Sequence, residues 1–239
     1  MTSLQRLASR LGYDLAPRRK ARSPDAQLAA VLERFSISCV LDVGANVGQY
    51  ALHLRALGYA GRIVSFEPLA GAHEELVRRA ESDPAWQVAP RTAIGERDGA
   101  VEMELSAESD MSSILPQSPL LRLISPSSAV IRRERVPIAR LDRIATGCLG
   151  PEDETFLKID VQGYERQVLE GVGDLLRTIR GIQLEMSLVP CYEGERGFRE
   201  TLDHLEAAGF ELYLLLPGYF ERKLARQLQV DGVFIRERD

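Results

Sequence analysis

The sequence has few cysteines and no long apolar run. Its three cysteines, Cys39, Cys148 and Cys191, are widely spaced and form no CxxC pair. This pattern is typical of reduced thiols rather than of a disulfide framework or a zinc site. No apolar run approaches the roughly 20 residues that cross a bilayer, and the first residues lack the apolar segment of a signal peptide. We therefore expect a cytoplasmic protein.

Basic residues are in the minority, with 30 Lys and Arg against 35 Asp and Glu. Because phosphate binding needs a basic surface, this balance argues against nucleic acid as a partner. The exception is the segment 1–22, which has six basic residues and only Asp14 to oppose them. We expect a solvated basic helix and linker over residues 1–24. Contact with an anionic membrane or an acidic partner through residues 1–22 is the alternative.

Short apolar runs alternate with helical patterns along the rest of the chain. The expected strands are residues 39–43, 62–66, 88–94, 156–160, 182–188, 210–216 and 229–235. The expected helices are residues 26–35 with Asp25 as the N-cap, 47–57, 72–81, 164–179 and 198–208. This alternation predicts an α/β fold with a doubly wound, mostly parallel sheet, in one domain over residues 25–239.

The alternation breaks after Gly95. Asp98-Gly99 has the chemistry of a hairpin turn, and a half-exposed antiparallel strand is expected after it. Residues 106–130 are rich in Ser and Pro and indicate a long loop, of the kind that is often a functional lid. A returning strand is expected over 135–141. We therefore predict an inserted β-hairpin and a mobile, lid-like region over residues 106–134.

A turn with two glycines follows the first expected strand, in Val40-Leu41-Asp42-Val43-Gly44-Ala45-Asn46-Val47-Gly48-Gln49-Tyr50. Gly44 permits a tight turn, the small Ala45 leaves room for a ligand, and Gly48 lets the helix pack closely. Asn46 stands where a dinucleotide fingerprint has its second glycine, which disfavours a nicotinamide oxidoreductase. Asp42 suits a cationic methionine moiety better than a pyrophosphate.

The second expected strand ends at Glu67, 23 residues after Gly44 and directly before Pro68. A carboxylate at this position can accept hydrogen bonds from both ribose hydroxyls of a nucleotide. The alternative interpretation gives these residues no function: the glycine turn only caps a helix, and Glu67 is a surface residue.

Several motifs resemble those of the FkbM-type S-adenosylmethionine-dependent methyltransferases. They are residues 40–48, Phe66-Glu67-Pro68, Ala93-Ile94-Gly95 with Asp98-Gly99, Ser112-Ser113, residues 157–165, 188–194 and 229–234. The resemblance covers about residues 36–236 and implies a Rossmann-like class I methyltransferase fold. It also implies O-methylation of a hydroxyl on a sugar, glycolipid or polyketide-like small molecule. The family usually has Glu where this chain has Gln162, so a role that needs a charge there does not carry over.

The expected S-adenosylmethionine site combines the nucleotide-type turn with the motifs of this resemblance. Its residues are Asp42, Gly44, Ala45, Asn46, Gly48, Gln49, Tyr50, Glu67, Pro68, Ala93, Ile94, Ser112, Ser113 and Asp160.

An alcohol is a poor nucleophile until its proton is removed or its developing charge is stabilised. Lys158 and Asp160 flank Ile159 on one strand, so both point to the same face. Asp160 is the candidate general base, or a ligand for a divalent cation such as Mg²⁺ together with Glu185 on the next strand. Lys158 either stabilises an alkoxide or forms a salt bridge with Asp160. The catalytic candidates are thus Asp160, Lys158 and Glu185.

Other reactive residue types have simpler interpretations. His53, His73 and His204 fall in expected helices away from the strand ends and are interpreted as packing or surface residues. Cys191 follows Pro190, as the nucleophile of cytosine C5 methyltransferases does, but the acidic composition disfavours that reaction. Two further functions stay open: a catalytically silent cofactor-binding scaffold and a methyltransferase that acts on a macromolecule.

Overall fold

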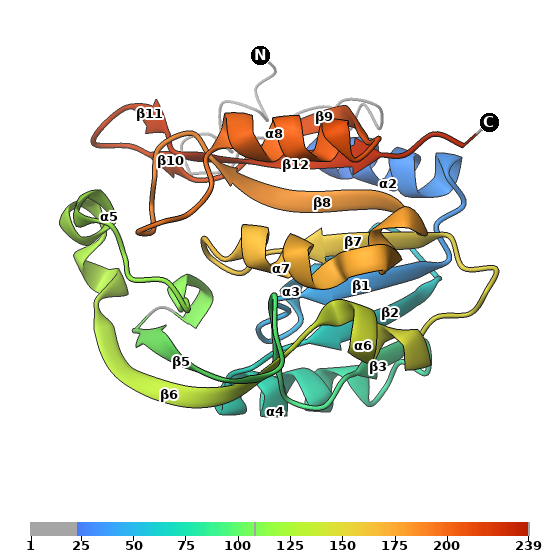
Figure 1. The fold of residues 1–239 in the computed structure, drawn as a ribbon, viewed down its shortest axis with the longest axis horizontal. Coiled ribbons are helices and arrows are strands. Elements are labelled where there is room, and N and C mark those ends of the chain that lie inside the picture. Colours follow the sequence, from blue (N-terminus) through green and yellow to red (C-terminus); the bar gives the residue numbers. More distant parts are fainter. Residues whose placement is uncertain (1–22, 108, 239) are drawn as a thin grey trace, which may run out of the picture.

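The computed structural model describes residues 23–107 and 109–238. Their main feature is a seven-stranded sheet in the order β3-β2-β1-β7-β8-β12-β9 (Figure 1). The strands are β1 (Cys39–Val43), β2 (Arg62–Phe66), β3 (Trp86–Val88), β7 (Thr155–Ile159), β8 (Ile179–Ser187), β9 (Glu211–Pro217) and β12 (Gln229–Ile235). Strand β12 runs antiparallel to both neighbours, and the other pairs are parallel. The expected Rossmann-like class I methyltransferase fold is confirmed.

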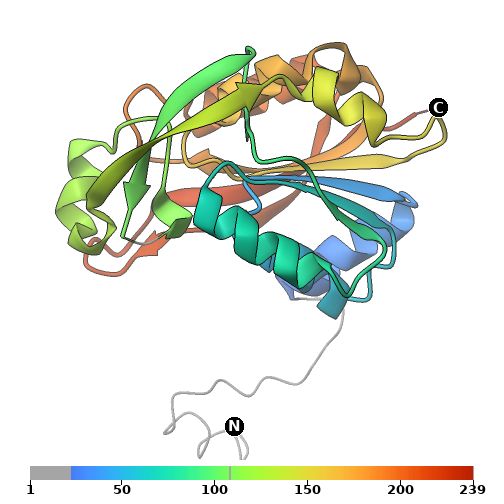
Figure 2. The ribbon, with the colours of Figure 1, turned by 90° about the horizontal axis from the view of Figure 1, so that it is seen from below.

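Helices cover both faces of the sheet, because the residues of each strand alternate between the two faces. One face packs against α2 (Pro24–Arg34), α3 (Gln49–Ala56) and α4 (Ala70–Ala80). The other packs against α6 (Leu141–Ile144), α7 (Glu165–Val172) and α8 (Phe198–Ala207). Figure 2 shows the sheet between these two layers. Every residue of β1 and β7 is buried, as expected for central parallel strands.

A second, three-stranded sheet has the order β4-β6-β5, with β4 (Ala93–Ile94), β5 (Gly99–Ser106) and β6 (Val130–Ala139). Two expectations are wrong here. Residues 88–94 are not one strand: the run ends at β3 and resumes as β4, because Pro90 has no N–H to continue a ladder. Strand β5 does not pair with the strand before the Asp98-Gly99 turn. Its antiparallel partner is β6, which begins after the insertion.

The segment between β5 and β6 is not the long plain loop that its composition indicates. It contains helix α5 (Pro119–Ile124) and two 3-10 turns, Ser109–Met111 and Pro126–Ser128. Leu121 of α5 is 1% exposed and packs with Cys191, Tyr192 and Leu228. These apolar contacts give the segment a defined structure. Its role as a lid stays a prediction.

The remaining differences concern the ends of elements. Helix α2 begins at Pro24, and its N-cap is Ser23, whose Oγ accepts a hydrogen bond from Ala26 N at 3.1 Å, rather than Asp25. Helix α3 begins only at Gln49, because the preceding glycine has a left-handed backbone. The helix expected over 164–179 ends at Val172 and continues as a 3-10 turn, Gly173–Arg177.

A short hairpin that the sequence did not indicate, β10 (Phe220–Glu221) and β11 (Arg226–Gln227), follows β9. None of the helices in the described parts of the chain is long and apolar enough to cross a membrane. The expected basic helix over residues 1–22 lies outside the described residues.

Candidate functional site

A cavity of about 670 Å³ lies at the carboxyl ends of β1, β2 and β7, where the strand order reverses. Doubly wound sheets bind their ligands at this point. Most of the predicted site residues line the cavity: Gly44, Ala45, Asn46, Gln49, Tyr50, Glu67, Pro68, Ala93, Ile94, Ser112, Lys158 and Asp160. Its volume is that of a small-molecule site.

The glycine turn joins three strands at the cavity floor. Gly44 has φ +80°, and its N–H and that of Ala45 both donate to the carbonyl oxygen of Phe66 at 3.1 Å. A Cβ atom on Gly44 would lie 1.8 Å from the Asp160 carbonyl oxygen. The turn therefore needs glycine both for its backbone conformation and for its contact with β7.

Glu67 is held at the end of β2 by backbone groups. Its Oε2 accepts a hydrogen bond from Asn46 N and its Oε1 one from Leu69 N, both at 2.8 Å. The side chain lines the cavity although the residue is only 4% exposed. Burial raises the pKa of Glu67 to about 7, against the effect of the two backbone hydrogen bonds. Each carboxylate oxygen has a second lone pair that a ligand hydroxyl can use.

Lys158 and Asp160 form an ion pair at the carboxyl end of β7, with the Lys158 side chain buried and the Asp160 side chain 41% exposed. The Nζ of Lys158 donates to Asp160 Oδ2 at 3.0 Å and lies 5.1 Å from the ring centre of Tyr50. Burial lowers the pKa of Lys158, but the carboxylates of Asp160 and Asp42 more than offset this and hold it above its usual value. The pKa of Asp160 is lowered, because Lys158 and Gln162 outweigh its burial. Both side chains are therefore charged near neutral pH.

Gln162 is fixed by three hydrogen bonds at the entrance to α7. Its Nε2 donates to Asp160 Oδ1 at 2.8 Å, and its Oε1 accepts from the Tyr192 hydroxyl at 2.8 Å. Its carbonyl oxygen accepts from Ser113 Oγ at 2.6 Å. An amide satisfies both side-chain partners, since it has one donor end and one acceptor end. Glutamate at this position would place a second carboxylate against Asp160.

Four predicted site residues lie behind the cavity wall. Gly48 packs against Trp86, whose ring would be 2.6 Å from a Cβ atom at position 48, and this confirms its expected packing role. Ser113 holds Gln162, as described above. Glu185 accepts a hydrogen bond from Gln229 Nε2 at 2.7 Å and faces no open space of the cavity.

Asp42 is the fourth of these residues and does not reach the cavity either. It is fully buried in β1, next to Ser65 on β2 and Lys158 on β7. Its Oδ2 accepts from Ser65 Oγ at 3.1 Å, and Oδ1 has no hydrogen-bond partner among the described residues. Burial raises the pKa of Asp42 to about 6. The charge of Asp42 acts on Lys158, whose pKa it raises.

Sequence reasoning missed two polar residues on the cavity floor. Gln183 of β8 accepts a hydrogen bond from the Tyr50 hydroxyl at 2.8 Å and donates to Asp231 Oδ2 of β12 at 3.3 Å. Both Gln183 and Asp231 line the cavity. The only signal in the sequence is that Gln183 stands between two apolar residues and Asp231 follows one, and this pattern does not show that either residue faces the cavity.

The expectation that His53 lies away from the strand ends is wrong. It lines the cavity, with its Nε2 at 3.3 Å from Asp25 Oδ1 of α2. The reason is that α3 starts at the cavity, so that Gln49, Tyr50 and His53 share the face that looks into it.

Trp86, Tyr192 and Cys191 are interpreted as packing residues. Trp86 is 5% and Tyr192 1% exposed. Burial raises the pKa of the Cys191 thiol to about 12, so it stays protonated and is no nucleophile.

The donor set around Asp160 does not fit a divalent cation. Lys158 and Gln162 already donate to the two oxygens of Asp160, and Glu185 is bound by Gln229. Within residues 23–107 and 109–238, no group of three or more His, Cys, Asp or Glu side chains is arranged to hold a metal ion. The Lys158 ammonium takes the place next to Asp160 where the expected Mg²⁺ would bind.

Known proteins are similar in sequence to the part of the chain that forms this site. The family model "Methyltransferase FkbM domain" matches residues 42–212. The AMB antimetabolite synthetase AmbE of Pseudomonas aeruginosa is 30% identical over 176 residues, which are 62% of this chain and 8% of that protein. The chain thus matches a small part of that relative's length.

Solved structures with low sequence identity are also similar. Aeropyrum pernix fibrillarin with bound S-adenosylmethionine has 13% identity and a TM-score of 0.49, with 87% of this chain and 73% of that chain covered. TehB of Haemophilus influenzae has 9% identity and a TM-score of 0.48, covering 88% and 62%. An rRNA methylase of Streptococcus thermophilus has 10% identity and a TM-score of 0.46, covering 94% and 100%. On the family match over residues 42–212, the chain belongs to the FkbM methyltransferase family of S-adenosylmethionine-dependent enzymes.

Proposed function

We propose that the protein transfers the methyl group of S-adenosylmethionine to a hydroxyl of a small molecule such as a sugar, a glycolipid or a polyketide-like compound. The observation that carries this proposal is the presence of Glu67 and the Lys158–Asp160 pair in one cavity at the switch point of the sheet. We further propose that it acts in the cytoplasm, in keeping with its three free cysteines.

The residues of the cavity fit the cofactor part by part. Glu67 would accept hydrogen bonds from the ribose hydroxyls, since both of its oxygens are fixed by backbone N–H groups. The apolar side chains of Leu69, Ala93 and Ile94 line the wall beside Glu67 and would hold the adenine. The carboxylates of Asp160 and Asp231 line the other side of the cavity and would attract the cationic sulfonium and ammonium groups.

When bound, S-adenosylmethionine would supply a methyl group on a positively charged sulfur, which would keep the electron pair of the S–C bond. The acceptor oxygen uses a lone pair to form the new O–C bond and must lose its proton. We assign that proton to Asp160. Its low pKa is no obstacle, because the hydroxyl becomes strongly acidic as its oxygen gains the methyl group.

Lys158 and Gln162 act as positioning residues in this scheme. Their hydrogen bonds at 3.0 and 2.8 Å hold the two oxygens of Asp160 in one orientation. A fixed carboxylate favours the in-line geometry that methyl transfer needs, since misalignment of the reacting atoms slows such a step strongly.

The test is a transfer assay with S-adenosylmethionine that carries a radiolabelled methyl group. The acceptors are a panel of glycosides, a glycolipid extract and hydroxylated polyketides, with RNA and unrelated proteins as controls. We expect label in a small molecule, in a bond that resists mild alkali as an ether does. Label in RNA or protein would favour the macromolecular alternative. Binding of S-adenosylhomocysteine without transfer to any acceptor would favour the silent scaffold.

A further inference from the structure

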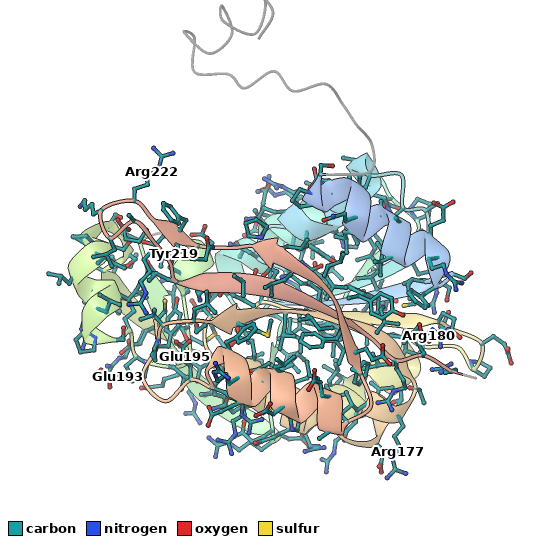
Figure 3. The ribbon with its side chains drawn as sticks, turned by 90° about the horizontal axis from the view of Figure 1, so that it is seen from above. Arg177, Arg180, Glu193, Glu195, Tyr219 and Arg222 are labelled. Atoms are coloured by element: carbon teal, nitrogen blue, oxygen red, sulfur yellow. The ribbon has the colours of Figure 1, made fainter. Side chains whose placement is uncertain are left out.

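The β10–β11 hairpin carries an exposed surface that the proposed function does not use. This hairpin surface consists of Phe220, Arg222, Lys223, Leu224 and Arg226. Phe220 is 49% and Leu224 45% exposed, and the three cations are exposed as well. Only two residue pairs form the hairpin ladder, so its four-residue loop projects from the molecule. Figure 3 shows Arg222 pointing outward at this end.

Within the described parts of the chain, the cations of the hairpin surface form no ion pair, in contrast to other exposed arginines of the protein. Arg122, Arg132 and Arg133 all pair with glutamates. Among the described residues, no ion pair includes a cation of the hairpin surface.

The single acidic residue of the hairpin, Glu221, interacts with Lys223 and offsets only one of the three positive charges. Glu221 is 8% exposed and accepts hydrogen bonds from the Tyr219 hydroxyl and from Lys223 N, both at 2.8 Å. The hairpin surface is therefore a local positive charge on a protein whose net charge is −5.

A third large apolar side chain lies on the neighbouring helix. Leu123 of α5 is 76% exposed. Helix α5 and the hairpin are neighbours, because Leu121 and Ile124 pack in one cluster with Tyr219 and Leu228. Figures 1 and 2 both show α5 and the hairpin at the same end of the molecule.

The shape and chemistry of this end fit a bilayer better than a protein partner. A stable protein interface buries about 800 Å² on each partner in complementary surfaces, whereas a projecting loop of a few residues offers far less. A bilayer interface needs no complementary shape. It accepts apolar side chains flanked by Lys and Arg, whose charges are attracted to anionic headgroups.

We propose that the hairpin surface docks this protein on an anionic lipid bilayer. The position of the hairpin surface bears on how an acceptor reaches the cavity. This step of the inference rests on the proposed function. Leu216 and Pro217 line the cavity at the end of β9, and the hairpin begins three residues later at Phe220, so the docked surface continues from a strand that forms part of the cavity wall. An acceptor hydroxyl carried on a membrane lipid would then reach the cavity without leaving the bilayer.

The experiment is co-sedimentation of the full chain with vesicles of phosphatidylcholine alone and of phosphatidylcholine mixed with phosphatidylglycerol. We expect binding to the mixed vesicles only, and weaker binding as salt is raised. The double variant Arg222→Glu/Lys223→Glu should lower the partition coefficient about ten-fold or more. Phe220→Ser/Leu224→Ser should lower it as well, whereas Arg222→Lys should keep it.

The matched control is Arg177→Glu, which changes an exposed arginine at the other end of the molecule (Figure 3). This control should bind as the unchanged protein does. Equal binding to both kinds of vesicle, or no binding to either, would overturn the proposal. So would hairpin variants that bind normally, because the basic segment 1–22 would then carry the attraction. A dimer that the same variants abolish would assign the hairpin surface to a second copy of the chain and overturn it too.

The affinity for S-adenosylhomocysteine separates this inference from the proposed function. The hairpin variants should keep that affinity, because no residue of the hairpin surface lines the cavity. Vesicle binding without methyl transfer would refute the proposed function and leave the docking intact. Methyl transfer by a protein that does not bind vesicles would refute the docking and leave the proposed function intact.

Discussion

Gly44 and Asp160 touch backbone to backbone, with the Asp160 carbonyl oxygen 1.8 Å from the place where a Cβ atom on Gly44 would lie. Asp160 N also donates to Val43 O at 3.0 Å. The glycine turn after β1 and the carboxyl end of β7 are thus joined through their backbones. A change in the turn must move Asp160 as well.

The substitution Gly44→Ala should therefore be more damaging than a change in backbone conformation alone explains. Gly58→Ala is the matched control, since Gly58 has a similar φ of +92° but nothing within 4 Å of its Cβ position. The control should lose about 1–2 kcal/mol of unfolding free energy. Gly44→Ala should lose clearly more, and its affinity for S-adenosylhomocysteine should fall. Equal losses in urea unfolding would show that the contact with Asp160 does not matter.

Glu67→Gln should weaken the binding of S-adenosylhomocysteine. Both carboxylate oxygens face backbone N–H donors at 2.8 Å, and a glutamine amide would turn a donor toward one of them. The expected loss is about 1.5–3 kcal/mol in isothermal titration calorimetry, the size of a charged hydrogen bond. The exposed Glu74 of α4 provides the control Glu74→Gln, which should bind normally. An unchanged affinity in folded Glu67→Gln would remove Glu67 from the ribose site.

Asp42 should make the protein less stable as the pH rises. Its folded pKa of about 6 exceeds the usual value of 3.8 for an aspartate, so the folded state holds the proton more tightly. The stabilisation is complete below the unfolded pKa and is lost as the pH rises through about 6. The loss amounts to about 3 kcal/mol for a shift of this size. Asp42→Asn cannot titrate, so its unfolding free energy in urea should rise relative to that of the unchanged protein between about pH 4 and 7. A constant difference over that range would contradict the burial argument.

The sequence predicts the main sheet well and the insertion poorly, for a physical reason. Strands such as β1 and β7 are mostly apolar runs, because both of their faces are covered. The pairing of β5 with β6 joins residues separated by the whole insertion, and no local pattern encodes such a partner. Helix α5 is only six residues long, too short to show a clear period.

The site was predictable where a motif fixes the backbone and not where side chains meet across strands. Gly44 and Glu67 could be found from their spacing. Gln183 and Asp231 come to the cavity only through the register of β8 and β12, which the sequence does not reveal. The pairing of Asp160 with Lys158 was one of two open interpretations, and the structure shows the ion pair.

Asp160→Asn should keep the cofactor and lose the reaction. The amide has the same shape, so the affinity for S-adenosylhomocysteine should stay within a few-fold. Turnover should fall by about 10² or more, because the amide cannot take the proton. Asp203→Asn, an exposed change on α8, is the control and should be fully active. Near-normal turnover in Asp160→Asn would contradict the assignment of Asp160 as the group that takes the proton.

Chelation should leave the activity unchanged, since Lys158 and Gln162 already occupy the oxygens of Asp160. The measurement is methyl transfer before and after EDTA treatment, followed by addition of Mg²⁺ or Mn²⁺. A loss with EDTA that Mg²⁺ restores would show that Asp160 does bind a metal ion, with the lysine displaced.

Gln162→Glu should create the cation dependence that the unchanged protein lacks. It replaces the Nε2 donor, which lies 2.8 Å from Asp160 Oδ1, by a carboxylate oxygen. Two carboxylates this close cannot both ionise, so one of the two pKa values must rise. Asp160 would then be the active base only at higher pH, and the acidic limb of the pH–rate profile should move upward. Mg²⁺ should restore activity at low pH, because a divalent cation favours both ionised carboxylates.

Gln162→Met is the control: it removes the same donor without adding a charge, so its activity should not respond to Mg²⁺. A profile for Gln162→Glu that matches the unchanged protein, with no response to Mg²⁺, would show that residue 162 does not act on Asp160 during turnover.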